Sequence, residues 1–181
     1  MAVSTQRIVF AGGPGSGKTT LLQALALRGY PVAADSPRSI IRARRSRSLT
    51  PRPARREFAE AVLRQDIRQY DELAGRPGPV FFERGVVDAL GMLHELGDLE
   101  EPELQSLLAA YPYHHQVFLF PPWEAIYATD DERDQTFAEA ERVCHATSGW
   151  YRRCGYALIE VPRAPVAERC AHVLKVLGAA P

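Results

Sequence analysis

The sequence contains neither a long apolar run nor a cysteine framework. No apolar run approaches the roughly 18 residues that a membrane-spanning helix requires, so no transmembrane segment is expected. No charged region followed by an apolar stretch and a small-residue cleavage site opens the chain, so no export signal is predicted. Cys144, Cys154 and Cys170 are odd in number and lack Cys-x-x-Cys spacing, which argues against disulfides or a zinc site. These absences favour a cytoplasmic protein.

Acidic residues are almost absent from the first third of the chain. Basic and acidic residues balance overall at 22 each, but residues 1–56 contain eleven Lys or Arg and one acid, Asp35. Residues 57–181 carry the opposite imbalance, with eleven basic and 21 acidic residues. Arginine outnumbers lysine 20 to 2. Because GC-rich codon usage produces the same ratio, arginine abundance alone says little about function.

Length and composition are those of one globular domain. The 181 residues are 46% hydrophobic and 24% charged, which is ordinary for a chain that buries a substantial core. No internal repeat or low-complexity tract divides the sequence. Residues 1–181 are therefore predicted to form a single domain.

Residues 12–19 are the most informative segment of the chain. They read Gly-Gly-Pro-Gly-Ser-Gly-Lys-Thr and match G-x-x-x-x-G-K-[ST], the phosphate-binding P-loop. Backbone N–H groups and the following helix N-terminus attract phosphate in such a loop. Lys18 can reach the β- and γ-phosphates, and the Thr19 hydroxyl can ligate Mg²⁺. The predicted nucleotide-binding residues are Gly12, Gly13, Pro14, Gly15, Ser16, Gly17, Lys18, Thr19 and Thr20.

Apolar strands alternate with helical patterns along the whole chain. Strands are predicted at 7–11, 31–34, 80–82, 117–120 and 156–161. Helices are predicted at 17–28, from an N-cap at Ser36 through 41, and at 57–74, 86–97, 101–110, 133–153 and 164–177, with a loop at 43–56. This alternation predicts an α/β P-loop NTPase fold, a five-stranded parallel sheet with helices on both faces. Ligands bind such sheets at the carboxyl ends of the strands.

Asp35 follows the second predicted strand, at that ligand-binding edge. A carboxylate there could accept a proton from a substrate hydroxyl or hold a Mg²⁺-bound water. The alternative is a helix N-terminal acid beside Ser36 and Pro37, stabilised by the helix dipole.

Glu83 and Arg84 follow the third predicted strand. An apolar strand that ends in a carboxylate resembles a Walker B strand, whose acid orients Mg²⁺. Arg84 could hold a phosphate through bidentate hydrogen bonds. A structural ion pair is the alternative for these two residues. Asp88, one turn later, is a weaker candidate for the site and is expected on the helix face.

Residues 121–135 lie where P-loop kinases carry a lid. Arg133 could swing from the start of the long helix onto the γ-phosphate and stabilise charge in the transition state.

An arginine-rich segment spans residues 38–56 and contains no acid. A phosphorylated substrate, a nucleic acid or an acidic partner would be attracted to it. No aromatic residue occurs within it, which disfavours base stacking and therefore nucleic-acid binding. A solvated loop that faces the acidic half of the protein is an equal alternative. Its arginines are Arg38, Arg42, Arg44, Arg45, Arg47, Arg52, Arg55 and Arg56.

These motifs together resemble a known family. The P-loop, Glu83-Arg84-Gly85, the predicted lid and the Trp-Tyr-x-x-Cys-Gly-Tyr run at 150–156 are similar to those of small AAA-domain predicted ATPases of the P-loop kinase type. Those proteins are relatives of ribosylnicotinamide kinases and, more distantly, of deoxynucleoside and thymidylate kinases. The resemblance covers nearly the whole chain and implies ATP binding on a five-stranded parallel sheet.

The resemblance also implies roles for individual residues. It makes 12–19 the nucleotide loop, Glu83 and Arg84 the acid–arginine pair of the kinases, and Arg133 a lid arginine. Family members commonly have a Glu followed by an Arg after the second strand, where this chain has Asp35 and Arg38.

Two functions are compatible with the sequence. The first is an ATP- and Mg²⁺-dependent phosphotransferase for a small, nucleoside-like or other acceptor, with Lys18, Asp35, Glu83, Arg84 and Arg133 as catalytic residues and Thr19 and Glu83 at the metal. The second is a regulatory ATPase or switch with a protein or nucleic-acid partner on the arginine-rich segment. A GTPase is disfavoured because no Asn-Lys-x-Asp motif occurs.

Overall fold

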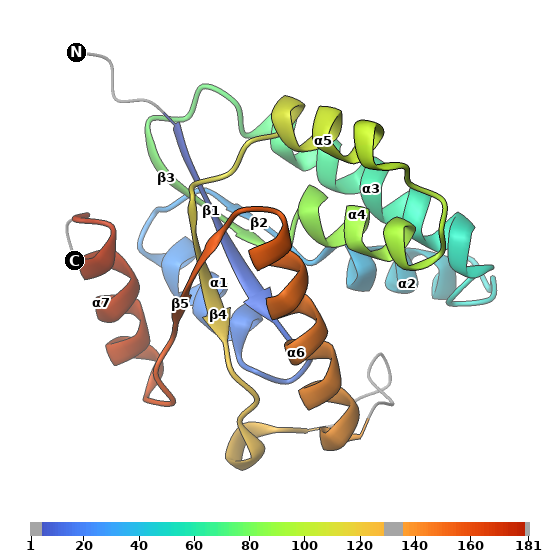
Figure 1. Ribbon diagram of the computed structural model, residues 1–181. Helices are drawn as coiled ribbons and strands as arrows, with labels where there is room; N and C mark the ends of the chain where they lie inside the picture. The colour runs from blue at the N-terminus through green and yellow to red at the C-terminus, as the bar shows by residue number, and fades with distance from the viewer. Residues whose placement is uncertain (1–4, 129–135, 180–181) are drawn as a thin grey trace.

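A five-stranded parallel sheet forms the centre of the protein (Figure 1). The computed structural model describes residues 5–128 and 136–179. The sheet order is β2-β3-β1-β4-β5, and every strand pair in it is parallel. The strands are β1 (Thr5–Gly12), β2 (Val32–Ala33), β3 (Gly78–Glu83), β4 (Gln116–Phe120) and β5 (Ala157–Glu160). The predicted fold class is confirmed.

Helices connect the strands and cover both faces of the sheet. They are α1 (Lys18–Leu27), α2 (Ser36–Arg45), α3 (Arg55–Glu72), α4 (Val86–Glu95), α5 (Glu101–Ala110), α6 (Phe137–Arg153) and α7 (Val166–Val176), with a 3₁₀ turn η1 (Glu124–Ile126). Within 5–128 and 136–179, none of the helices combines the length and apolar character that crossing a membrane requires.

Two hydrophobic cores lie on opposite faces of the sheet. Alternate residues of β1 divide between them, since Ile8 and Phe10 point to one core while Val9 and Ala11 point to the other. The first core contains α1 and α7, and the second contains residues of α3, α4, α5 and α6. Figure 1 shows α6 on one side of the sheet and α1 with α7 on the other. Burial on both faces explains why the central strands are continuously apolar.

The register of the central strands brings their carboxyl ends to one edge. Phe10 of β1 pairs with Glu83 of β3 and with Phe118 of β4, and Ala33 of β2 pairs with Phe82. The segments that follow β1, β2, β3 and β4 therefore begin side by side. This edge carries the residues discussed below.

Several helix boundaries differ from the sequence-based prediction, chiefly at the 43–56 loop and at the starts of α2 and α6. Helix α2 continues to Arg45, so residues 43–45 are helical, which agrees with the good helix propensity of arginine. Its N-cap is Asp35, not Ser36. Helix α6 begins at Phe137 instead of 133, because Thr136 and Glu139 form a capping box at that point.

The aromatic cluster around Phe10 is expected to dominate stability. Phe10 is fully buried, and its ring centroid lies 5.5 Å from that of Phe81 and 5.0 Å from that of Phe120. F10A leaves a cavity there and should lower the free energy of unfolding by about 3–5 kcal/mol. Urea unfolding checks this. L27A is the control, because Leu27 is 90% exposed; equal midpoints for both variants would contradict the prediction.

Candidate active site

The polar residues that follow the strands line one cavity of about 520 Å³. Residues 14–20 form one wall, and Asp35, Glu83 and Arg84 form another. Four predicted catalytic residues, Lys18 among them, therefore meet in one space. Arg133, the fifth, and most of the second half of the predicted lid lie outside the described residues, whereas Ile126 of η1 lines the cavity.

Close packing explains the first two glycines of the loop. A Cβ atom on Gly12 would lie 2.4 Å from the Phe120 carbonyl oxygen, and one on Gly13 would lie 2.3 Å from the Ala140 carbonyl oxygen. The loop thus begins wedged between the end of β4 and helix α6. Gly12 and Gly13 therefore allow the loop to pack closely against β4 and α6, while residues 14–20 line the cavity.

Lys18 lies at the base of the loop and is 4% exposed. Its Nζ donates to the carbonyl oxygens of Gly12 and Gly13, at 3.1 and 2.6 Å. Burial, helped by the charge of Arg84, lowers the pKa of Lys18 to about 8, while Glu83 and Asp35 oppose that shift. At the floor of the cavity, these two backbone carbonyl groups therefore solvate the Lys18 ammonium in place of water.

Thr19 and Glu83, the two residues predicted to bind the metal, lie in contact with each other. The Thr19 hydroxyl donates to Glu83 Oε1 at 2.9 Å. The other oxygen of Glu83, Oε2, is buried and has no hydrogen-bond partner. Burial raises the pKa of Glu83 against the opposing effect of Lys18. A hydroxyl next to a carboxylate with a spare oxygen fits Mg²⁺, which takes few protein ligands beside substrate phosphates.

Among the described residues, no larger metal cluster competes with this pair. Among residues 5–128 and 136–179, no group of three or more His, Cys, Asp or Glu side chains is arranged to hold a metal ion.

Arg84 joins Asp35 to Asp88. Its Nε lies 3.4 Å from Asp35 Oδ1, without hydrogen-bond geometry, and its NH1 lies 3.6 Å from Asp88 Oδ1. Burial lowers the pKa of Arg84, but the neighbouring Asp35, Asp88 and Glu83 outweigh that effect and leave the pKa raised. Arg84 therefore keeps its charge in the interior.

The backbone of Arg84 is held in a left-handed conformation, with φ at 65°. Such a conformation costs on the order of 1–3 kcal/mol for a residue with a side chain. The Arg84 N–H donates to the Phe10 carbonyl oxygen at 3.0 Å, and the two ion pairs hold the side chain. These contacts support the strained residue at the cavity wall.

The Asp88 side chain is 8% exposed and faces Arg84 and Tyr151 at the first turn of α4. Its Oδ2 accepts from the Gly85 N–H at 3.1 Å and from the Tyr151 hydroxyl at 2.5 Å. Burial raises the pKa of Asp88 despite the charge of Arg84. The residue lies at the third position of α4, where its carboxylate both caps the helix and compensates Arg84.

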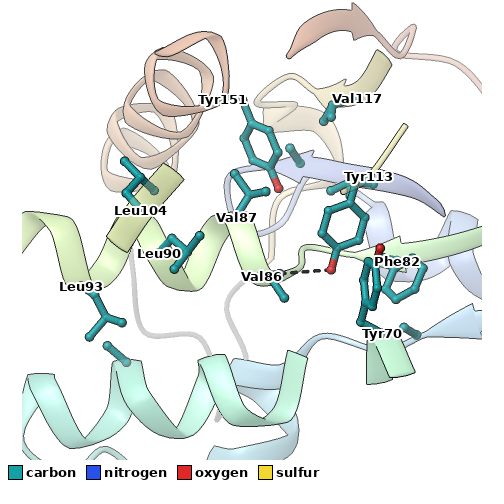
Figure 2. Packing of buried hydrophobic residues seen from close by; sticks show 14 of the residues in the cluster. Tyr70, Phe82, Val86, Val87, Leu90, Leu93, Leu104, Tyr113, Val117 and Tyr151 are labelled. Atoms are coloured by element: carbon teal, nitrogen blue, oxygen red, sulfur yellow. Dashed lines mark hydrogen bonds between the residues drawn. The ribbon is translucent and has the colours of Figure 1, made fainter. Parts of the chain in front are cut away.

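Two tyrosines of the second hydrophobic core, Tyr113 and Tyr151, form hydrogen bonds with the first turn of α4. Figure 2 shows the Val86 N–H donating to the Tyr113 hydroxyl, at 3.2 Å, with Tyr151 pointing toward the same turn. Tyr70 and Phe82 flank Tyr113 in this cluster (Figure 2). The site thus stands on a packed aromatic base.

A buried carboxyl that sequence reasoning missed supports α2. Asp66 of α3 accepts a hydrogen bond from the Ser36 hydroxyl at 2.5 Å, and Gln69 donates to the same Ser36 oxygen at 2.7 Å. Ser36 therefore bonds across to α3, which explains why it is not the N-cap. The signal was present: Asp66 shares the helix face of the apolar residues Val62 and Tyr70.

Arg169 of α7 is a second missed residue. Its guanidinium lines the cavity beside the P-loop, with NH1 3.4 Å from the Gly17 carbonyl oxygen and Cζ 5.5 Å from the Trp123 ring centroid. Its Nε is buried without a hydrogen-bond partner. The sequence does contain a signal for this residue. Arg169 lies four residues before the buried Val173, on the otherwise apolar face of α7.

The sheet order, the glycine loop after β1 and the helix that begins at Lys18 define a P-loop NTPase fold. The chain belongs to the AAA domain family, whose model matches residues 7–169. The resemblance predicted from the motifs is confirmed. No curated protein sequence matches this one.

Two solved structures show how widely the fold is shared. Deoxyadenosine kinase from M. mycoides with bound dATP has a TM-score of 0.63 at 11% identity, over 96% of this chain and 100% of that chain. Thymidylate kinase from Candida albicans has a TM-score of 0.64 at 12% identity, over 98% of this chain and 93% of that one. At these identities the likeness concerns the fold.

Asp66 should make stability depend on pH. Burial raises the pKa of Asp66 from 3.8 to about 7, so the native state binds more protons than the unfolded chain between these values. Stability falls as pH rises through that window, by up to about 4 kcal/mol. In D66N this loss is absent. We expect D66N to gain stability relative to the wild type between pH 5 and pH 8 in urea unfolding.

D71N, at an exposed position of the same helix, is the control and should follow the wild type. Parallel pH curves for D66N and the wild type would show that Asp66 does not hold its proton in this way.

Proposed function

We propose that this protein is an ATP- and Mg²⁺-dependent phosphotransferase that acts on a small acceptor. The observation that carries the proposal is the meeting of Lys18, the Thr19–Glu83 pair and the Asp35–Arg84 pair in one cavity. Likeness in fold to a deoxyadenosine kinase and a thymidylate kinase supports it.

The P-loop side of the cavity would bind the donor phosphates. Backbone N–H groups at the start of α1 and the Lys18 ammonium supply positive charge there. Lys18 would leave its hydrogen bonds to the Gly12 and Gly13 carbonyl oxygens and contact the β- and γ-phosphates instead. Arg169 and Ile126 border the same end of the cavity and would contact the rest of the nucleotide. Arg133 completes this proposal as a lid arginine on the γ-phosphate.

Thr19 and Glu83 would hold Mg²⁺, which when bound neutralises charge on the β- and γ-phosphates. The unpartnered Glu83 Oε2 is the atom that supports this assignment.

Asp35 would receive the proton of the acceptor. In the transfer, the acceptor oxygen forms a bond to the γ-phosphorus, the bond from that phosphorus to the β-bridging oxygen breaks, and ADP leaves. A hydroxyl acceptor then releases its proton to the Asp35 carboxylate. Arg84 positions this carboxylate from 3.4 Å away.

A second cavity supports transfer to an acceptor over regulation by hydrolysis alone. It measures about 480 Å³ and shares Pro14, Pro37, Ile41, Arg52 and Arg84 with the first cavity. Hydrolysis requires room for water only, whereas this adjoining space is large enough for a small molecule.

K18A should abolish nucleotide-dependent turnover. The substitution removes the cation at the floor of the loop, and ATP affinity should fall by about tenfold or more. Binding of a fluorescent ATP analogue and ADP release measure the two effects. K175A is the matched control, since Lys175 is the only other lysine of the sequence and lies exposed near the end of α7. Unchanged ATP affinity and turnover in K18A would refute the proposed site.

D35N should separate chemistry from nucleotide binding. Loss of the proton-accepting carboxylate should lower kcat by about 10²- to 10⁴-fold. The KM for ATP should stay near its wild-type value, because Asp35 would contact the acceptor and not the nucleotide. The measurement is ADP release in the presence of an acceptor found by screening a metabolite library. D71N serves as control. Full kcat in D35N would assign Asp35 to a structural role.

A further inference from the structure

Arg169 is a buried cation at the P-loop end of the first cavity. It is 4% exposed, although it comes from α7, far along the chain from the loop. A Cβ atom on Gly17 would lie 2.6 Å from its NH1 atom, so the guanidinium packs directly against the loop where α1 begins. The cavity lining at this end also includes the apolar side chains of Ile126 and Val166.

Within the part of the chain that the structure describes, Arg169 has no negative counter-charge. Its NH1 lies 3.4 Å from the Gly17 carbonyl oxygen, which already accepts from the Leu21 N–H at 3.2 Å. Its Cζ lies 5.5 Å from the Trp123 ring centroid, and its Nε has no hydrogen-bond partner. Burial lowers the pKa of Arg169, and no described carboxylate offsets that effect. A neutral carbonyl group and a ring face therefore replace the water that a guanidinium normally binds.

Two helix N-termini make this position less favourable for a cation. The NH1 atom lies beside Gly17, the N-cap of α1, and Arg169 itself belongs to the first turn of α7, where its side chain leans toward the helix start. The N-terminal end of a helix carries partial positive charge, so it attracts anions and disfavours cations. Glu168, the acid of the same turn, is exposed and occupies the adjacent position, which faces a different side of the helix. The place therefore suits a bound anion.

Arg169 and Lys18 approach the P-loop from different sides. Lys18 donates to the carbonyl oxygens of Gly12 and Gly13, the residues that pack against β4 and α6. Arg169 reaches Gly17 from α7, and Figure 1 shows α6 and α7 on opposite sides of the sheet. The two cations can therefore contact different parts of one bound molecule.

We infer that Arg169 binds the α-phosphate of the donor nucleotide. This inference rests on the proposed function and adds a residue to its donor site. Lys18 and Mg²⁺ would contact the β- and γ-phosphates, whereas Arg169 borders the loop beside the apolar Ile126 and Val166. The α-phosphate joins the phosphate chain to the nucleoside, so it is the phosphate that fits a cation next to apolar side chains. The planar fork of arginine binds two phosphate oxygens through parallel hydrogen bonds.

The first test compares the stability of the protein without nucleotide. A buried cation that awaits an anion destabilises the empty protein, so R169M should raise the midpoint of urea unfolding. An arginine with a structural role would show the opposite, because its replacement removes contacts that hold α7 to the loop. R28Q is the control, since Arg28 lies exposed at the other end of α1. A midpoint of R169M below that of the wild type assigns Arg169 a structural role and overturns the inference.

The second test measures affinity for adenosine, AMP, ADP and ATP by displacement of the fluorescent ATP analogue. Because all three nucleotides carry the α-phosphate, R169M should weaken each of them by about tenfold or more and leave the affinity for adenosine unchanged. R169K, which keeps the charge but not the planar fork, should recover part of the loss. R28Q should bind all four compounds as the wild type does.

Other patterns in this series contradict the assignment. A loss confined to ATP would place Arg169 at the γ-phosphate, and a loss that includes adenosine would place it at the nucleoside; either result overturns the inference. K18A tests the proposed function separately, because it should weaken ADP and ATP but not AMP. Unchanged ATP affinity in K18A refutes the proposed donor site itself, whereas weakened binding in K18A with wild-type affinities in R169M refutes the role of Arg169 alone.

Discussion

The partly buried ion pairs of Arg84 with Asp35 and Asp88 are the interaction on which the site depends. They join the end of β3 to the starts of α2 and α4. Removing one partner of such a pair is unfavourable, because the other charge is left uncompensated in a region largely shielded from water. The pairs therefore fix Asp35 relative to the P-loop, and they also hold Arg84 in its left-handed conformation.

Buried acids dominate the electrostatics around this centre. Burial raises the pKa values of Glu83, Asp66 and Asp88, and it lowers that of Lys18. Lys18 and Glu83 line the cavity, and groups with shifted pKa values in a cavity are typical of sites that move protons or bind charged ligands. The cavity wall around Arg84 packs against the tyrosines and Phe82 of the second hydrophobic core. This packing can hold the side chains of the site in place when no ligand is bound.

Sequence reasoning reached the residues that follow strands, because strand ends in a parallel sheet share one edge. It placed Thr19, Asp35, Glu83 and Arg84 at that edge for this reason. It paired Arg84 with Glu83, however, whereas the structure pairs Arg84 with Asp35 and Asp88. It misplaced Ser36 and did not predict the partners of Asp88, since these contacts depend on Asp66 and Tyr151 of other helices. It passed over Arg169, because a residue 152 positions beyond Gly17 becomes its neighbour only when α7 packs on α1.

The P-loop and the alternation of strands and helices were determined by the sequence alone, because both are local patterns of residue type and spacing. The tertiary structure alone decided where the arginines of 38–56 lie, with Arg44 and Arg56 in ion pairs with Glu57 and Asp98, and with Arg38, Arg52 and Arg55 lining the cavities. In sequence these arginines are alike. Their roles differ because the turn of each helix, and the carboxylates that other helices bring near, determine where each guanidinium lies.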